Sequence, residues 1–174
     1  SLATMVANLS SHKKGWDERW EEFSNWAEKG EALKNKLTRL VDADTHAFNR
    51  ILKAFAMPKS NDDERLWRNR AIQDATRFAI DIPFTVMQTA FESMEVIKAM
   101  AEIGNPNSVS DAGVGALCAR SAVMGAFMNV RINTTDYDDK EFVKEIIAKG
   151  KAIEDKAMAL EAEILSIVNA KIGA

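Results

Sequence analysis

Apolar residues recur at spacings of three and four along nearly the whole chain, and no stretch of any length alternates apolar and polar residues. Spacings of three and four keep side chains on one face of an α-helix, whereas a half-buried strand needs strict alternation. A chain of 174 residues suits one domain with a sizeable core. We therefore expect residues 1–174 to form a single all-α domain, an antiparallel bundle of about five to six helices.

Three prolines divide the chain into four blocks, and each is expected at a helix boundary because proline disfavours helix interiors. The first block predicts a short helix from Leu2, a break near Ser10–Gly15 and a long helix from Asp17. The other expected helices begin at Ser60-Asn61-Asp62-Asp63 (an N-cap with acidic residues), at Pro83 (closing at Gly104), at Ser108 (closing near Asn133) and at Tyr137 (closing near Ala170).

Charge and residue usage exclude several classes of protein. A net charge of −3, from 23 Lys+Arg and 26 Asp+Glu, excludes a dedicated binder of nucleic acid or anionic membranes. A single cysteine cannot build a disulfide framework, and two histidines leave no histidine-rich metal site. No secretory signal is recognisable, so we expect a cytoplasmic protein. Because the chain opens on Ser-Leu-Ala-Thr rather than methionine, we expect the natural N-terminus to lie upstream.

The last predicted helix has one apolar seam and one polar face, the pattern of a bundle helix with a solvated side. The seam consists of Val143, Ile146, Gly150, Ile153, Ala157, Leu160, Ile164 and Ile167. The polar face consists of Lys144, Lys151, Asp155, Ser166 and Asn169.

The helix around Ala112–Val130 differs because it is apolar nearly all round. Nineteen residues could span a membrane, but Arg120 near the centre would cost about 2.5–3.5 kcal/mol on insertion scales. A buried helix of a bundle fits better. Because a bundle of this size rarely buries a helix on all sides, we expect a second subunit to cover one face, as in a homodimer.

One carboxylate interrupts the apolar stripe of the long first helix. The stripe reads Leu33, Leu37, Leu40, position 44, Phe48, Ile51 and Phe55, and position 44 is Asp44. An aspartate in a core stripe is costly unless it is paired or hydrogen-bonded, and burial raises the pKa of a carboxyl group, as a proton shuttle requires. Asp42 lies about 200° away around the helix, so the two do not form a catalytic pair. The alternative is a structural Asp44 bonded to a helix end or an arginine.

A second unusual face lies on the glycine-rich helix. It consists of Asp111, Gly115, Cys118, Ala122, Gly125, Asn129 and Asn133. Polar groups at both ends with small residues between them let a neighbouring helix or a planar ligand approach the backbone closely. The structural alternative is tight helix packing, with Asp111 favouring the helix N-terminus and Asn133 ending the helix. Lys59, in a predicted loop, could receive an anionic ligand tail.

These positions coincide with motifs of a known family. Three groups of residues resemble motifs of the formiminotetrahydrofolate cyclodeaminase family. The first is Met5-Val-Ala-Asn-Leu-Ser10, and the second is Leu40-Val-Asp-Ala-Asp-Thr-His-Ala-Phe48 with Met57-Pro58-Lys59. The third is the series Gly104-Asn105, Ser110-Asp111, Gly125-Ala126 and Asn129-Val130-Arg131-Ile132-Asn133. The matching positions run from Met5 to about Asp139. The family's P-x-P-G-G-G turn, which precedes its first helix, has no counterpart in this chain.

The resemblance implies a helical, dimeric enzyme that closes 5-formiminotetrahydrofolate to 5,10-methenyltetrahydrofolate and releases ammonia during histidine breakdown. A close branch of the family acts instead as a methenyltetrahydrofolate cyclohydrolase. The second aspartate of V-D-A-D, the family's catalytic carboxylate, corresponds to Asp44. We further expect Asp111, Asn129 and Asn133 to bind the pterin or the formimino group, and Lys59 to bind the glutamate tail.

No metal and no cofactor beyond the folate substrate are expected. Association with a glutamate formiminotransferase is implied by the family, whereas nucleic acid and membrane partners are not. The competing hypothesis is a non-catalytic helical interaction protein, in which Asp44 and Asp111 are buried structural groups.

Overall fold

A computed structural model describes residues 1–173 as five α-helices and two short 3-10 helices, with no strand among them. The α-helices are α1 (Leu2–Ser11), α2 (Trp20–Phe55), α3 (Asp62–Ile103), α4 (Val109–Asn133) and α5 (Lys140–Ile172). The 3-10 helices are η1 (Asp17–Arg19), before α2, and η2 (Pro106–Ser108), before α4. The predicted all-α class and number of helices are confirmed.

Most predicted helix boundaries agree with the structure. Asn61 is the N-cap of α3, and its side chain accepts a hydrogen bond from the amide of Glu64 at 2.9 Å. α5 begins at Lys140 rather than near Tyr137, because Asp139 caps it by accepting from the amide of Phe142 at 2.9 Å. The predicted seam of α5 is buried or half-buried, and its predicted polar face is exposed.

The boundary predicted at Pro83 is wrong, since α3 continues through this residue. Proline has no amide hydrogen, so the carbonyl of Ala79, four residues earlier, loses its helical partner. The side-chain amide of Asn133, in the last turn of α4, donates to that carbonyl at 2.7 Å. A tertiary contact thus satisfies the group that proline leaves unpaired, and α3 remains one helix.

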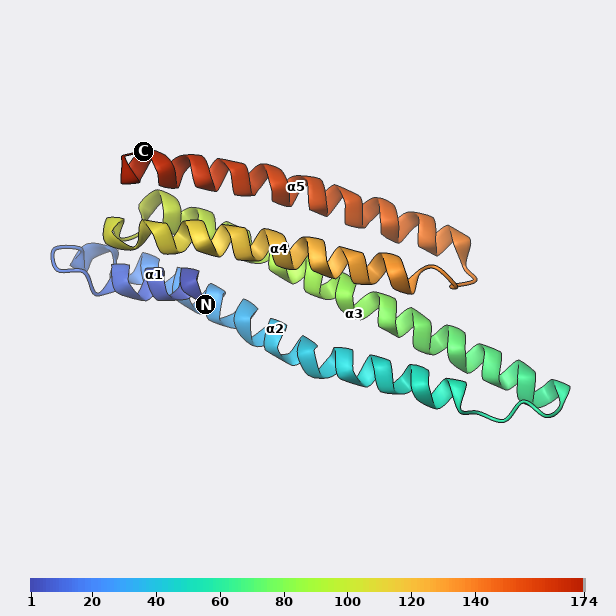
Figure 1. Cartoon of the computed structure of the whole chain (residues 1–174). Helices are drawn as coiled ribbons and strands as arrows, with labels where there is room; N and C mark the ends of the chain where they lie inside the picture. Colours follow the sequence, from blue (N-terminus) through green and yellow to red (C-terminus); the bar gives the residue numbers. More distant parts are fainter. Residues whose placement is uncertain (174) are drawn as a thin grey trace.

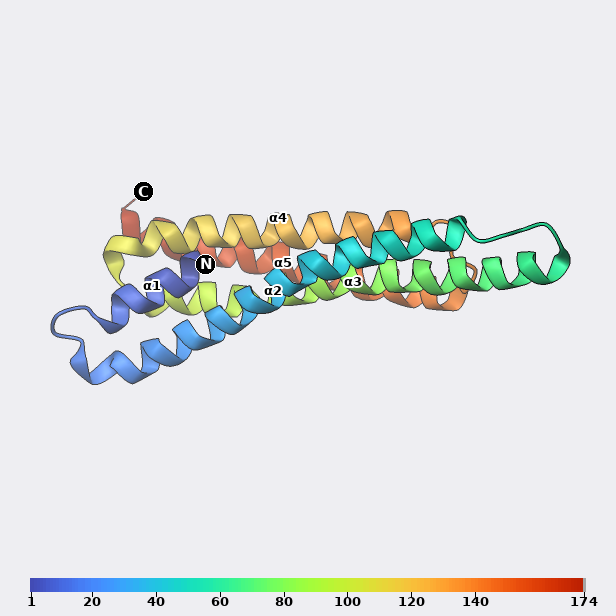
Figure 2. The ribbon, with the colours of Figure 1, turned by 90° about the horizontal axis from the view of Figure 1, so that it is seen from below.

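The helix α3 forms the spine of the bundle, since α2, α4 and α5 all pack against it (Figures 1 and 2). α2 and α4 run in the same direction, and α3 runs in the opposite direction (Figure 1). α1 packs across the first half of α2 and also contacts α3 and α4. The first turns of α3 and the α2–α3 connection extend beyond the ends of α4 and α5 (Figure 1).

Two glycines permit close contacts between helices. A Cβ atom at Gly30 of α2 would lie 2.6 Å from the hydroxyl of Thr4, so glycine lets α1 pack closely on α2. A Cβ atom at Gly150 of α5 would lie 2.3 Å from the ring of Phe127, so glycine also allows α4 and α5 to pack closely.

The apolar helix α4 is part of the bundle. Segment Pro106–Asn133 is the one described stretch long and apolar enough to cross a membrane, a test that core helices of soluble proteins also pass. Arg120, the residue that argued against membrane insertion, pairs through Nε with both carboxylate oxygens of Glu161 on α5, at 3.1 Å each. The arginine is therefore an interhelical contact within the bundle.

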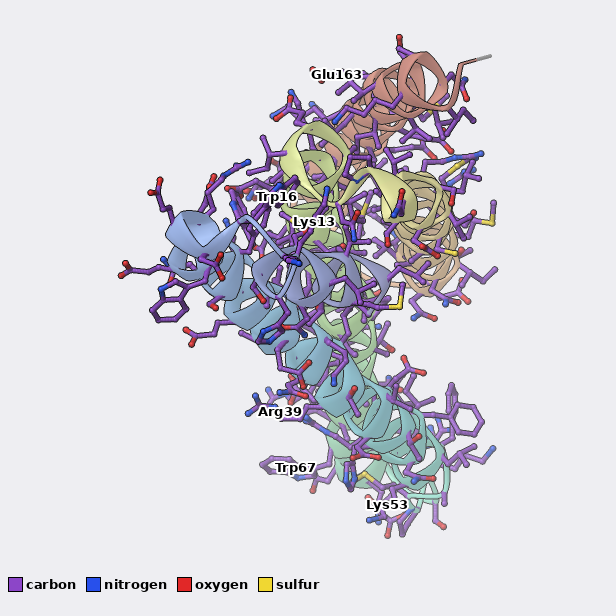
Figure 3. The ribbon with its side chains drawn as sticks, turned by 90° about the vertical axis from the view of Figure 1, so that its left-hand side faces the viewer. Lys13, Trp16, Arg39, Lys53, Trp67 and Glu163 are labelled. Carbon is purple, nitrogen blue, oxygen red and sulfur yellow. The ribbon has the colours of Figure 1, made fainter. Side chains whose placement is uncertain are left out.

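Large apolar side chains are exposed where the α2–α3 hairpin extends past the rest of the bundle. They are Phe48, Leu52, Phe55, Leu66 and Trp67. Viewed end-on, Trp67 and Lys53 of this hairpin lie on the opposite side of the molecule from Glu163 of α5 (Figure 3).

Candidate functional site

A groove of about 540 Å³ lies between α2 and α4, over α3, and is large enough for a small organic ligand. One wall is α2, with Gly30, Leu33, Lys34, Leu37, Thr38 and Val41. The other wall is α4, with Gly115, Cys118, Ala119 and Ala122. The floor is α3, with Ala90, Ser93, Val96 and Ile97, and the start of α1 closes one end with Ser1, Leu2 and Ala3.

The small residues predicted on one face of α4 form a wall of this groove. Gly115, Cys118 and Ala122 lie three and four residues apart and line it together. A Cβ atom at Gly115 would lie 3.6 Å from Ile97, an ordinary contact, so helix packing alone does not require glycine there. Of the two interpretations of this face, the groove favours the one in which a flat ligand approaches the backbone of α4.

The groove is mainly apolar, and several of its polar side chains already have partners. Thr38 donates to the carbonyl of Lys34 at 3.0 Å, and Ser93 donates to the carbonyl of Ala90 at 2.7 Å. Lys34 pairs with Glu31, one turn earlier on α2, and this hydrogen bond lowers the pKa of the Glu31 carboxyl group. Lys34 is the one charged side chain that lines the groove.

The prediction that Asp44 lies in a core stripe is wrong for the single chain, because its side chain is exposed. The face of α2 that is buried at this level contains Ala43 and Ala47 instead, and these pack with Ala79 and Ile82 of α3. Two neighbouring stripes of α2 are both apolar in sequence, and the one with Phe48 and Phe55 is the exposed one.

Asp44 nevertheless lies on the side of α2 that faces the groove. Seven residues, or two helical turns, separate it from the groove residue Leu37, and the two differ by only about 20° around the helix. On α4, Asn129 likewise follows the groove residue Ala122 by seven residues, or two helical turns, and therefore lies on the same side of the helix. Because α2 and α4 run in the same direction, Asp44 and Asn129 lie beyond the same end of the groove (Figure 1).

The other predicted site residues are not brought to that end. Asp111 lies in the first turn of α4, about 27 Å along the helix from Asn129, so both cannot bind one chemical group. Its position favours the structural interpretation, in which an acidic residue stabilises the positive end of a helix. Asn133 is half-buried and donates to the carbonyl of Ala79, as described above.

Lys59 lies in the α2–α3 connection, after the end of α2 at Phe55. Asp44 is about 17 Å from that end of the helix. Lys59 is therefore remote from the groove.

Sequence reasoning missed Gly30, Lys34 and the α3 floor of the groove. Gly30 gave a usable signal, because glycine inside a long helix is unfavourable unless something packs closely against it. Cys118, a member of the predicted small-residue face, is exposed in the groove.

These features define an all-α domain with an apolar groove between two parallel helices and a carboxylate beyond one end. The sequence profile of the family described as Formiminotransferase-cyclodeaminase matches residues 1–152, and the chain belongs to this family. The resemblance drawn from the sequence motifs is thereby confirmed.

Individual relatives cover nearly the whole chain. A methenyltetrahydrofolate cyclohydrolase from Methylorubrum extorquens is 33% identical over 172 residues, which are 99% of this chain and 83% of that protein. A formimidoyltransferase-cyclodeaminase from Rattus norvegicus is 29% identical over 171 residues, 98% of this chain but 32% of the rat protein. The crystal structure of formiminotetrahydrofolate cyclodeaminase from Thermotoga maritima superposes with a TM-score of 0.76 at 26% identity, covering 98% of this chain and 79% of that one.

Proposed function

We propose that this chain is a formimidoyltetrahydrofolate cyclodeaminase, a lyase that converts 5-formiminotetrahydrofolate to 5,10-methenyltetrahydrofolate and ammonia. The family match carries the proposal. It is supported by the geometry, since an apolar groove suits the flat rings of a folate and Asp44, the residue matching the family's catalytic carboxylate, lies beyond its end.

The proposed reaction needs one group that both accepts and donates a proton. N10 of the folate attacks the formimino carbon on N5, which forms the new carbon–N10 bond and a tetrahedral centre. The bond from this carbon to the formimino nitrogen then breaks, and ammonia leaves once that nitrogen has been protonated. We assign both transfers to Asp44, which takes the N10 proton and returns it to the leaving nitrogen. Asn129, at the same end, would hydrogen-bond the pterin or formimino group.

Methenyltetrahydrofolate cyclohydrolase is the second candidate. It is favoured by the 33% identical relative of that name, of which the chain spans 83%. In that reaction water attacks the methenyl carbon and the bond to N5 breaks, so a proton is again moved at the same carbon. The groove and Asp44 serve either reaction, and the motif V-D-A-D-x-x-A-F is our reason for placing the deaminase first.

The test is to supply the purified protein with 5-formiminotetrahydrofolate and to follow ammonia release and methenyl absorbance together. Equal rates of the two signals are expected from a cyclodeaminase. No reaction, but loss of absorbance when 5,10-methenyltetrahydrofolate is supplied, would assign the cyclohydrolase instead. Inactivity in both assays would reject both enzymes and leave the non-catalytic interaction protein.

We also propose that the chain forms a homodimer through the outer face of α4. This face carries Val114 (48% exposed), Leu117 (42%), Met128 (61%) and Ile132 (67%), with Ser121 and Gly125 between them and no charged residue in the stripe. The stripe is nearly symmetric about the middle of the helix. An antiparallel copy would pair Val114 with Ile132 and Leu117 with Met128, as a twofold interface requires, with opposed helix dipoles.

The proposal has three further parts. They are a role in histidine degradation through ammonia release, a cytoplasmic location, and association with a glutamate formiminotransferase. The last is supported by the rat relative, whose name includes a formimidoyltransferase and of which this chain spans about a third.

A further inference from the structure

Lys34 and Asp44 mark two points along the groove-facing side of α2. Ten residues separate them, which is about 15 Å along the helix axis. Between them the groove is walled by Leu37 and Val41 on α2 and by Cys118 and Ala122 on α4. Lys34 and Asp44 thus occupy positions about 15 Å apart along the helix axis, with an apolar surface between them.

We propose that the folate lies lengthwise in the groove, with its one-carbon unit at Asp44 and its glutamate carboxylate bound to Lys34. This inference rests on the proposed function. The p-aminobenzoyl ring, the amide and the glutamate side chain place the carboxylates about 10–15 Å from N10 by standard bond lengths. This span is comparable to the rise of about 15 Å along α2 between the two residues. The flat ring then lies against the small residues of α4, where the backbone can be approached closely.

Charge also favours this direction. A folate reversed in the groove would bring its carboxylates to Asp44 and leave Lys34 beside the neutral pterin. A tail directed to Lys59 would have to leave the groove and pass the exposed face of Phe48 and Phe55. Lys34 therefore replaces Lys59 as the tail-binding residue.

Glu31 is part of this arrangement because its carboxylate pairs with the ammonium group of Lys34. An arriving carboxylate has to compete with it. Removing the charge of Glu31 should strengthen tail binding, whereas removing that of Lys34 should weaken it.

The test compares Lys34→Gln with the unaltered protein on two substrates, 5-formiminotetrahydrofolate and the corresponding tetrahydropteroate that lacks glutamate. KM for the folate should rise about three- to tenfold, as a half-exposed ion pair allows, with kcat unchanged. KM for the pteroate should not change. Glu31→Gln should lower KM for the folate only.

Lys36→Gln is the matched control, because Lys36 lies two positions away on α2 and pairs with Glu92 of α3 instead of lining the groove. Lys36→Gln and Lys59→Gln should leave both KM values unchanged. An unchanged KM for the folate in Lys34→Gln, or an equal rise for both substrates, would overturn the tail assignment while leaving the enzymatic function in place.

Calorimetry with p-aminobenzoylglutamate, a fragment that cannot react, separates this assignment from the proposed function. Weaker binding to Lys34→Gln than to the unaltered protein supports the tail site even if neither folate reaction is detected. Equal binding to both proteins, or binding to neither, contradicts it.

Discussion

Asp44 and Asp42 carry the same carboxylate two positions apart on α2, but only Asp44 lies on the side that faces the groove. Replacing Asp44 with Asn should lower kcat by about 10²- to 10⁴-fold, the usual contribution of a general acid–base group. The melting temperature should stay the same because the side chain is exposed and has no buried partner to lose.

Asp42→Asn is the control for this variant, because it removes a carboxylate from the same helix on a different face. It should leave both turnover and melting temperature unchanged. Full turnover in Asp44→Asn would remove this residue from the mechanism, and a large loss of stability would indicate a structural aspartate.

At the scale of residues, the sequence predicted which positions are unusual better than it predicted where they lie. Periodicity singled out Asp44, but it could not decide which of two adjacent apolar stripes of α2 contacts α3, because that depends on how the helix is rotated about its axis. The same reasoning grouped Asp111 with Asn129 on one helix face, which is correct, although the length of α4 keeps them apart.

At the scale of helices, the link between α3 and α4 at Pro83 can be measured as a coupling energy. Asn133→Ala removes the donor to the buried carbonyl of Ala79 and should destabilise the fold by about 1–3 kcal/mol. In a Pro83→Ala background the restored amide can bond to that carbonyl, so the same substitution should cost at least about 1 kcal/mol less.

Urea unfolding of the two single variants and the double variant measures this difference. An equal cost of Asn133→Ala in both backgrounds would show that the hydrogen bond does not compensate for the proline.

Two helical glycines should respond oppositely to the same substitution. Gly150→Ala places a methyl group against the ring of Phe127 and should destabilise the protein by about 1–3 kcal/mol. Gly115→Ala meets Ile97 at an ordinary distance and should be neutral or more stable by up to about 1 kcal/mol, because alanine favours helix. Equal unfolding midpoints for the two variants in urea would contradict the packing described here.

Helix starts and ends were largely predictable, because capping residues such as Asn61 act locally. The failure at Pro83 has a different cause. Its compensating donor lies 54 residues from Ala79 in sequence, and a local rule about proline carries no information on a partner at that distance.

At the scale of the whole molecule, the apolar stripe of α4 makes the oligomeric state testable with a matched pair of methionines. Met128→Glu places a charge in the proposed twofold interface and should convert the dimer to a monomer in sedimentation velocity. Met158→Glu changes a residue of similar exposure on α5 and should remain dimeric. The dependence of melting temperature on protein concentration should disappear only in Met128→Glu. A monomeric unaltered protein would contradict the proposal.

The overall bundle was predictable because every element follows one period, whereas the groove was not. It arises because α2 and α4 are both positioned by α3, and the width left between two helices depends on how all three pack. The small residues on α4 indicated that something approaches this helix closely, but not whether it is a neighbouring helix or a ligand.

The hydrogen bond between Asn133 and Ala79 also has a consequence for the order in which the protein matures during synthesis. The ribosome completes all of α3 before Asn133 exists, so the carbonyl of Ala79 must be hydrated while the next 54 residues are added. Until the last turn of α4 has emerged from the ribosome, α3 lacks the donor that compensates for Pro83, and this position is the weakest point of the helix. The bundle therefore gains the contact that completes its spine only late in synthesis, after α3 and most of α4 have been made.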